Sequence, residues 1–146
     1  IDKPIEVTDA TLMEFVEQRP LVVIDFWHPL CGPCQELALV IDELAREYAG
    51  RCSFGKLNVA KNNSIDPHLK EKYNLRQGVP ALLFYKNGQL VDRIDDYHPD
   101  EMPSLIRQTI IVTFSLLTCS DPYSLPTASA FENSVFNLRE RILSRG

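Results

Sequence analysis

The stretch Trp27-His28-Pro29-Leu30-Cys31-Gly32-Pro33-Cys34 lies between a continuous apolar run and a segment whose apolar residues are spaced as in a helix. Residues 22–26, before it, are apolar apart from one carboxylate, which predicts a strand buried on both faces. The apolar residues after it recur at helical spacing and are Leu37, Val40, Ile41, Leu44, Ala45 and Tyr48. Two cysteines separated by Gly-Pro, between a strand and a helix, suggest dithiol–disulfide chemistry.

The flanking sequence predicts an α/β domain. Strands are expected at 21–26, 53–59, 81–85 and 90–94. Helices are expected at about 12–19, 34–48, 66–73 and 99–111. Strands separated by helices are expected to pair in parallel, and the last two strands, joined by Asn87-Gly88, to form an antiparallel hairpin. The prediction is a mixed central sheet with helices on both faces.

The domain is expected to span residues 1–112, followed by an extension at 113–146. Residues 120–129 have the composition of a linker. Beyond them, Phe131, Val135, Leu138 and Ile142 lie along one face of a possible terminal helix. Two interpretations stay open: a helix that packs on the domain or on a partner, or a mobile tail.

Length and charge narrow the class of protein. A chain of 146 residues with a net charge of -5 predicts one globular domain and argues against nucleic-acid binding. No apolar run reaches the length of a membrane span. The sequence begins at Ile1 rather than Met, so a removed leader or membrane anchor stays open. One close cysteine pair, with Cys52 and Cys119 alone, suggests a reducing compartment, and we expect the cytoplasm.

The spacing of the pair assigns a role to each cysteine. Cys31 falls at the expected helix start, where backbone N–H groups and the helix dipole favour a thiolate, so it is the predicted nucleophile. Cys34 lies one turn deeper and is the predicted resolving thiol. Pro33 suits the first turn of a helix, and Gly32 leaves room for a partner backbone.

Three further positions are expected to serve the dithiol. Asp25 lies within a buried strand, where burial raises a carboxyl pKa, and with Lys56 on the neighbouring strand it is a candidate base for Cys34. A structural Asp25 and a solvent-directed Lys56 are the alternatives. Pro80, at the entrance of a predicted strand, suggests a cis bond after Val79 that offers backbone groups to an extended substrate.

A zinc site is the alternative for the cysteine pair. A four-ligand site needs two more ligands at suitable spacing. Cys52, Cys119 and the three scattered histidines do not form a second pair, so no metal is expected. Trp27 is expected to pack beside the dithiol.

Taken together, these motifs resemble the thioredoxin family over roughly residues 4–112. The matching segments are Asp25-Phe26-Trp27, Cys31-Gly32-Pro33-Cys34, Lys56-Leu57-Asn58-Val59, Gly78-Val79-Pro80 and Phe84-Tyr85-Lys86-Asn87-Gly88. The resemblance implies a thioredoxin fold, a cis bond before Pro80 and a protein-disulfide reductase with Cys31 as the nucleophile. We expect substrate contacts at Trp27, Gly32, Pro33, Val79 and Pro80.

The same resemblance implies partners and a cellular role. Protein disulfides would be the substrates, a thioredoxin-reductase-like protein the electron donor, and redox homeostasis the role, with no cofactor beyond the cysteine pair. The chain departs from the family pattern at His28-Pro29, Leu30, Leu39, Ala81 and Asp96. Because several of these positions surround the dithiol, the alternative is an adaptor that binds one partner and has secondary redox activity.

Overall fold

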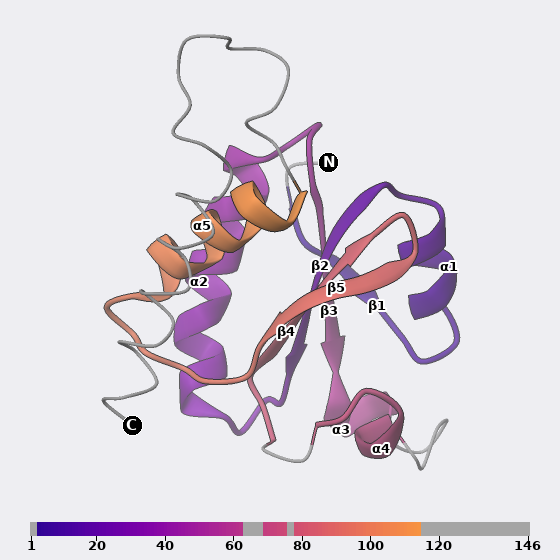
Figure 1. The fold of residues 1–146 in the computed structure, drawn as a ribbon. Helices are drawn as coiled ribbons and strands as arrows, with labels where there is room; N and C mark the ends of the chain where they lie inside the picture. Colours follow the sequence, from indigo (N-terminus) through magenta and orange to yellow (C-terminus); the bar gives the residue numbers. More distant parts are fainter. Residues whose placement is uncertain (1–2, 63–68, 76–77, 115–146) are drawn as a thin grey trace, which may run out of the picture. The chain divides into compact units, whose positions relative to one another are not determined.

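The computed structural model describes residues 3–62, 69–75 and 78–114 (Figure 1). In chain order the elements are β1 (Ile5–Val7), α1 (Leu12–Glu17), β2 (Leu21–Trp27), α2 (Gly32–Glu47), β3 (Ser53–Asn58), α3 (Val59–Asn62), α4 (Leu69–Lys72), β4 (Ala81–Lys86), β5 (Gln89–Ile94) and α5 (Met102–Phe114). The chain divides into two compact units, Ile1–Tyr97 and His98–Gly146.

The first unit is built on a mixed five-stranded sheet with the order β1-β3-β2-β4-β5. β3 pairs in parallel with β1 and with β2, while β4 pairs antiparallel with both β2 and β5. Helices α1 and α2 lie on opposite sides of this sheet (Figure 1). The predicted α/β fold class with a mixed sheet is confirmed.

Two details of the predicted sheet are wrong. β1 was not expected, because its three residues are too few to show an alternating pattern. β4 was expected to be parallel to the preceding strands, yet it runs antiparallel to β2, with Phe26 opposite Ala81. The reason is that β3 ends and β4 begins at the same edge of the sheet, so the segment between them is not a crossover.

Apolar packing on one face of the sheet joins the central strands to α1 and α4. Its buried members are Val7, Leu12, Phe15, Val16, Val22, Ile24, Phe26, Leu57, Leu69, Tyr73, Leu75, Ala81, Leu83 and Tyr85. Gly55, in the middle of β3, lets this layer close. A Cβ atom there would lie 2.8 Å from Ile24 Cδ1 and 3.1 Å from Phe15 Cε1.

The turns follow their sequence signals. Asn87 and Gly88 have φ angles of 52° and 83°, as the predicted hairpin between β4 and β5 requires. Gly50 follows α2 with a φ of 81°, which fits the expected stop. The strand expected at 53–59 ends one residue early, because Val59 begins α3.

The second unit contains α5, which begins at Met102 rather than at the expected residue 99. The N–H groups of Glu101 and Met102 both donate to the His98 carbonyl oxygen at 3.0 Å. Helix α5 runs to Phe114, and the remainder of the expected extension, residues 115–146, lies outside the described residues. The domain boundary at 112/113 stays a prediction. Among the described helices, none is long and apolar enough to cross a bilayer.

Candidate active site

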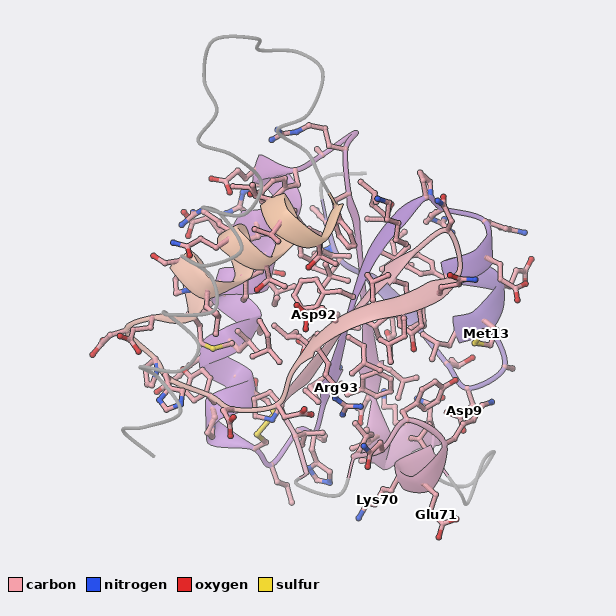
Figure 2. The ribbon with its side chains drawn as sticks, in the orientation of Figure 1. Asp9, Met13, Lys70, Glu71, Asp92 and Arg93 are labelled. Atoms are coloured by element: carbon pink, nitrogen blue, oxygen red, sulfur yellow. A yellow bond between two sulfur atoms is a disulfide. The ribbon has the colours of Figure 1, made fainter. Side chains whose placement is uncertain are left out.

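The two cysteines meet at the start of α2. Their sulfur atoms are joined in a disulfide, and the Cα atoms lie 5.2 Å apart. Figure 2 shows this bond in yellow at one end of α2. Cys31 is partly exposed, whereas the side chain of Cys34 is 1% exposed. An attacking partner can therefore reach only the first sulfur without moving the helix.

Cys31 is itself the N-cap residue of α2. Its backbone is extended, with φ -93° and ψ 110°, and its Sγ accepts a hydrogen bond of 3.2 Å from the Cys34 N–H. In the reduced form the same N–H and the dipole of the 16-residue helix would stabilise a negative sulfur. Gly32 and Pro33 are exposed at the first two helical positions, and nothing lies within 4 Å of a Cβ built on Gly32.

The loop before β4 lies against the nucleophile. The Val79-Pro80 peptide bond is cis, as expected from the position of the proline. The Val79 carbonyl oxygen is 3.7 Å from Cys31 Sγ. Val79 is partly exposed, while Pro80 is buried. A backbone group of the segment before β4 thus borders the sulfur.

Asp25 occupies the middle of β2 and is 3% exposed. Its neighbours Ile24 and Phe26 belong to the apolar layer with α1, so the alternation of a strand points Asp25 to the opposite face, on the side of α2. Its Oδ1 accepts no hydrogen bond from the described residues. Burial raises the pKa of Asp25 from 3.8 to about 7, although Lys56 opposes the shift.

Lys56 and Trp27 flank this carboxyl. Lys56 is the register partner of Asp25 across β2 and β3 and is half-buried. Its Nζ lies 6.0 Å from the centre of the Trp27 ring, at the limit of a cation–π contact. The Trp27 Nε1 is buried without a hydrogen-bond partner among the described residues. The predicted pairing of Asp25 with Lys56 on adjacent strands is therefore present.

A groove of about 280 Å³ opens beside Cys31. Its described lining consists of His28, Leu30, Cys31, Val59, Lys70, Leu75, Gly78 and Val79. Of the residues expected to contact substrate, Val79 is in this lining. The others, Trp27, Gly32, Pro33 and Pro80, are not. Lys70 and Leu75 were not predicted from the sequence as residues of the site. Val59 could have been predicted, because it directly follows β3, and the carboxyl ends of the parallel strands β2 and β3 lie at the same edge of the sheet.

The positions that depart from the family pattern differ in exposure: Pro29, Leu30, Leu39 and Asp96 are exposed, His28 is partly exposed and Ala81 is buried. Leu30 and Leu39 expose 89% and 72% of their surface, so neither is held by the core. His28 faces the groove, and its Nδ1 accepts a hydrogen bond of 3.0 Å from the Leu30 N–H. Asp96 is exposed, whereas its neighbour Asp95 binds Arg93.

Comparison with known proteins identifies the family. The thioredoxin family profile matches residues 3–110. The chain belongs to the thioredoxin family. It is 43% identical over 90 residues to the chloroplastic M-type thioredoxin of Spinacia oleracea, covering 61% of this chain and 47% of that protein. Thioredoxin 1 of a Nostoc species is 38% identical over 90 residues, covering 61% of this chain and 79% of the relative.

A solved relative shares the fold. A point-mutant thioredoxin from Halobacterium salinarum superposes with a TM-score of 0.59 at 29% identity, covering 73% of this chain and 89% of the other. The chain spans about half the length of the plant relatives that it matches, 47% for spinach and 49% for Pisum sativum. Among the described residues, no cluster of three or more histidine, cysteine or acidic side chains is placed to hold a metal.

Proposed function

We propose that this thioredoxin-family chain is a thiol–disulfide oxidoreductase that reduces protein disulfides through Cys31 and Cys34. The observation that carries the proposal is the disulfide between a partly exposed sulfur that caps a helix and a buried sulfur one turn below it. A nucleophile must be accessible and ionised, whereas a resolving thiol must be near and shielded from other partners. The two environments fit these two roles.

The reaction begins with the Cys31 thiolate attacking one sulfur of the substrate disulfide. A mixed disulfide forms, and the other substrate sulfur leaves as a thiolate that takes up a proton. The Cys34 thiol then loses its proton to the Asp25 carboxylate and attacks Cys31 Sγ. The substrate leaves with both sulfurs reduced, and the protein holds the Cys31–Cys34 disulfide until a donor returns two electrons and two protons.

Asp25 suits the role of base because its pKa is about 7. At neutral pH it is partly ionised, so it can both accept a proton and release it again. Lys56, its register partner, would hold the ionised form in place.

The substrate is proposed to be an extended protein segment carrying a disulfide. The Val79 backbone beside Cys31 offers a partner for main-chain hydrogen bonds, and the groove that includes Leu30 and Leu75 offers an apolar surface for a side chain. A thioredoxin-reductase-like donor would regenerate the dithiol, with no added cofactor. We propose a reducing compartment, the cytoplasm, because among the described residues Cys52 is a free thiol and Cys31–Cys34 is the one disulfide.

Reduction of insulin by dithiothreitol tests the function. Wild-type protein should accelerate it, and Cys31→Ser should abolish the acceleration. Cys34→Ser should accumulate a mixed disulfide between Cys31 and the substrate, visible as a mass increase that a reductant reverses. Cys52→Ser is the matched control, because this thiol is buried and should leave the rate unchanged. Equal rates for wild type and Cys31→Ser would overturn the proposal.

A further inference from the structure

Arg93 on β5 joins two segments that are far apart in the sequence. Its Nε and Nη2 donate to the two carboxylate oxygens of Asp95 at 2.8 and 2.7 Å. Its Nη1 and Nη2 also donate to the carbonyl oxygens of Tyr73 and Asn74 at 3.2 and 2.9 Å. Asp95 thus orients the guanidinium plane, and the remaining N–H groups bind backbone. Figure 2 labels Arg93 in the region between the sheet and α4.

These two carbonyls belong to the turn that ends α4. Asn74 has a left-handed φ of 54°. The Asn74 N–H donates to the Glu71 oxygen at 3.2 Å, and the Leu75 N–H donates to the Lys70 oxygen at 2.7 Å. This pair of bonds is the Schellman ending of a helix, which satisfies carbonyls of the last helical turn. The carbonyls of Tyr73 and Asn74 lie beyond that pattern, and Arg93 is their hydrogen-bond donor.

The same turn leads directly to the wall of the groove beside Cys31. Leu75, 3% exposed, contributes to both the apolar core and the groove lining. The Gly78 N–H donates to the Leu75 carbonyl at 2.9 Å, and the Val79 carbonyl lies 3.7 Å from Cys31 Sγ. Consecutive contacts therefore connect the Arg93 guanidinium to the backbone that borders the nucleophile. Helix α4 has four residues, so it supplies little rigidity of its own.

We propose that Arg93, oriented by Asp95, is a positioning residue that holds the substrate groove in its binding geometry through the turn at 73–75. The inference rests on the proposed reductase function and adds a residue that does not touch the substrate. Without the two hydrogen bonds from Arg93 to Tyr73 and Asn74, the turn would sample other conformations and would have to be ordered each time a protein segment binds. That ordering raises KM for a protein substrate. A small aromatic disulfide, which does not pair with the Val79 backbone, is unaffected.

The test compares Arg93→Met with wild type. Methionine keeps an unbranched stem but removes the donors. We expect KM for insulin to rise at least about fivefold, the net effect of one hydrogen bond, because Arg93→Met removes both bonds to the turn; kcat should be unchanged. Exchange with Ellman's reagent should stay within about twofold of wild type, because its rate is set by the sulfur itself. Arg93→Lys, which can bind one acceptor at a time, should give an intermediate KM.

Arg19→Met is the matched control for stability. The Arg19 guanidinium also donates to a backbone carbonyl, that of Phe15 at 3.3 Å, and lies 4.1 Å from the centre of the Phe15 ring. It precedes β2, at the edge of the sheet opposite Cys31. An equal rise of KM in Arg19→Met, or no rise in Arg93→Met, would refute the positioning role.

Hydrogen exchange separates this inference from the proposed function. In Arg93→Met the amides of Leu75 and Gly78 should exchange about fivefold faster than in wild type, since local opening becomes easier. The amides of β3 should exchange at the wild-type rate. Unchanged exchange at both loop amides would contradict the inference whatever the enzyme assay shows. Failure of the wild-type protein to reduce insulin, with faster exchange in the variant, would overturn the reductase function alone.

Discussion

An Asp25→Asn substitution replaces a buried carboxyl with an amide of nearly the same shape. The folded protein holds Asp25 with a pKa of about 7, against 3.8 for an ordinary aspartate. Between these two values the folded state keeps a proton that the unfolded chain has released. The contribution of this proton on Asp25 to the free energy of unfolding is fully present below pH 3.8 and is lost as pH rises through about 7.

The size of the effect follows from linkage. A shift from 3.8 to about 7 corresponds to about 4 kcal/mol in the free energy of unfolding, at about 1.4 kcal/mol per unit. Integrated over the accessible range, the wild type should lose about 3 kcal/mol relative to Asp25→Asn between about pH 5 and about pH 9. Most of this loss occurs below about pH 7. Above about pH 9 the difference in the free energy of unfolding between the two proteins is constant.

Urea unfolding of the oxidised proteins across this pH range measures the effect. The midpoint for Asp25→Asn should move above that of wild type as pH rises, with the slopes unchanged. Asp100→Asn, which makes the same change of side chain at an exposed position, serves as the control. A difference between Asp25→Asn and wild type that does not change with pH would refute the burial argument. It would also remove the support for Asp25 as the base.

Three further substitutions or treatments test other parts of the structure. Gly55→Ala should lower the free energy of unfolding by about 1–3 kcal/mol in urea titrations, because its Cβ would meet Ile24 and Phe15. Burial raises the pKa of Cys52 to about 12, so in a Cys119→Ser background the oxidised protein should not react with iodoacetamide at neutral pH until it unfolds. Leu30→Ala should change stability by less than about 0.5 kcal/mol, since Leu30 is 89% exposed, yet weaken binding of protein substrates.

Much of the fold was predictable because its local signals are strong. Three local patterns each predict one kind of structure: the apolar run before Cys31 predicts a strand, the apolar stripe after it a helix, and Asn87-Gly88 a hairpin turn. The structure contains all three. The direction of β4 was not predictable from element order. It depends on whether the chain between β3 and β4 crosses the sheet, and residues 59–80 give no signal for that.

The site divides in the same way. The Cys31–Cys34 disulfide and the cis bond at Pro80 are read from local motifs and are present. The roles of Asp25 and Lys56 stay proposals, although the strand register does pair them. Arg93 was not found, because its partners Tyr73 and Asn74 lie 20 and 19 positions away and are bound through backbone atoms. The interpretation of the terminal segment as packed or mobile concerns residues outside the described part.

The antiparallel entry of β4 has a consequence for engineering. It brings the connections after β2 and β3 and before β4 to one edge of the sheet, where the dithiol lies. The opposite edge carries the short turns at 18–20, 49–52 and 87–88, and the Asn87 N–H ties two of them through the Pro20 carbonyl at 2.8 Å. A fluorophore, affinity tag or inserted domain at 49–52 would leave this tie intact. The protein could thus be immobilised through the turn at 49–52 while the Cys31–Cys34 disulfide, at the opposite edge of the sheet, stays accessible.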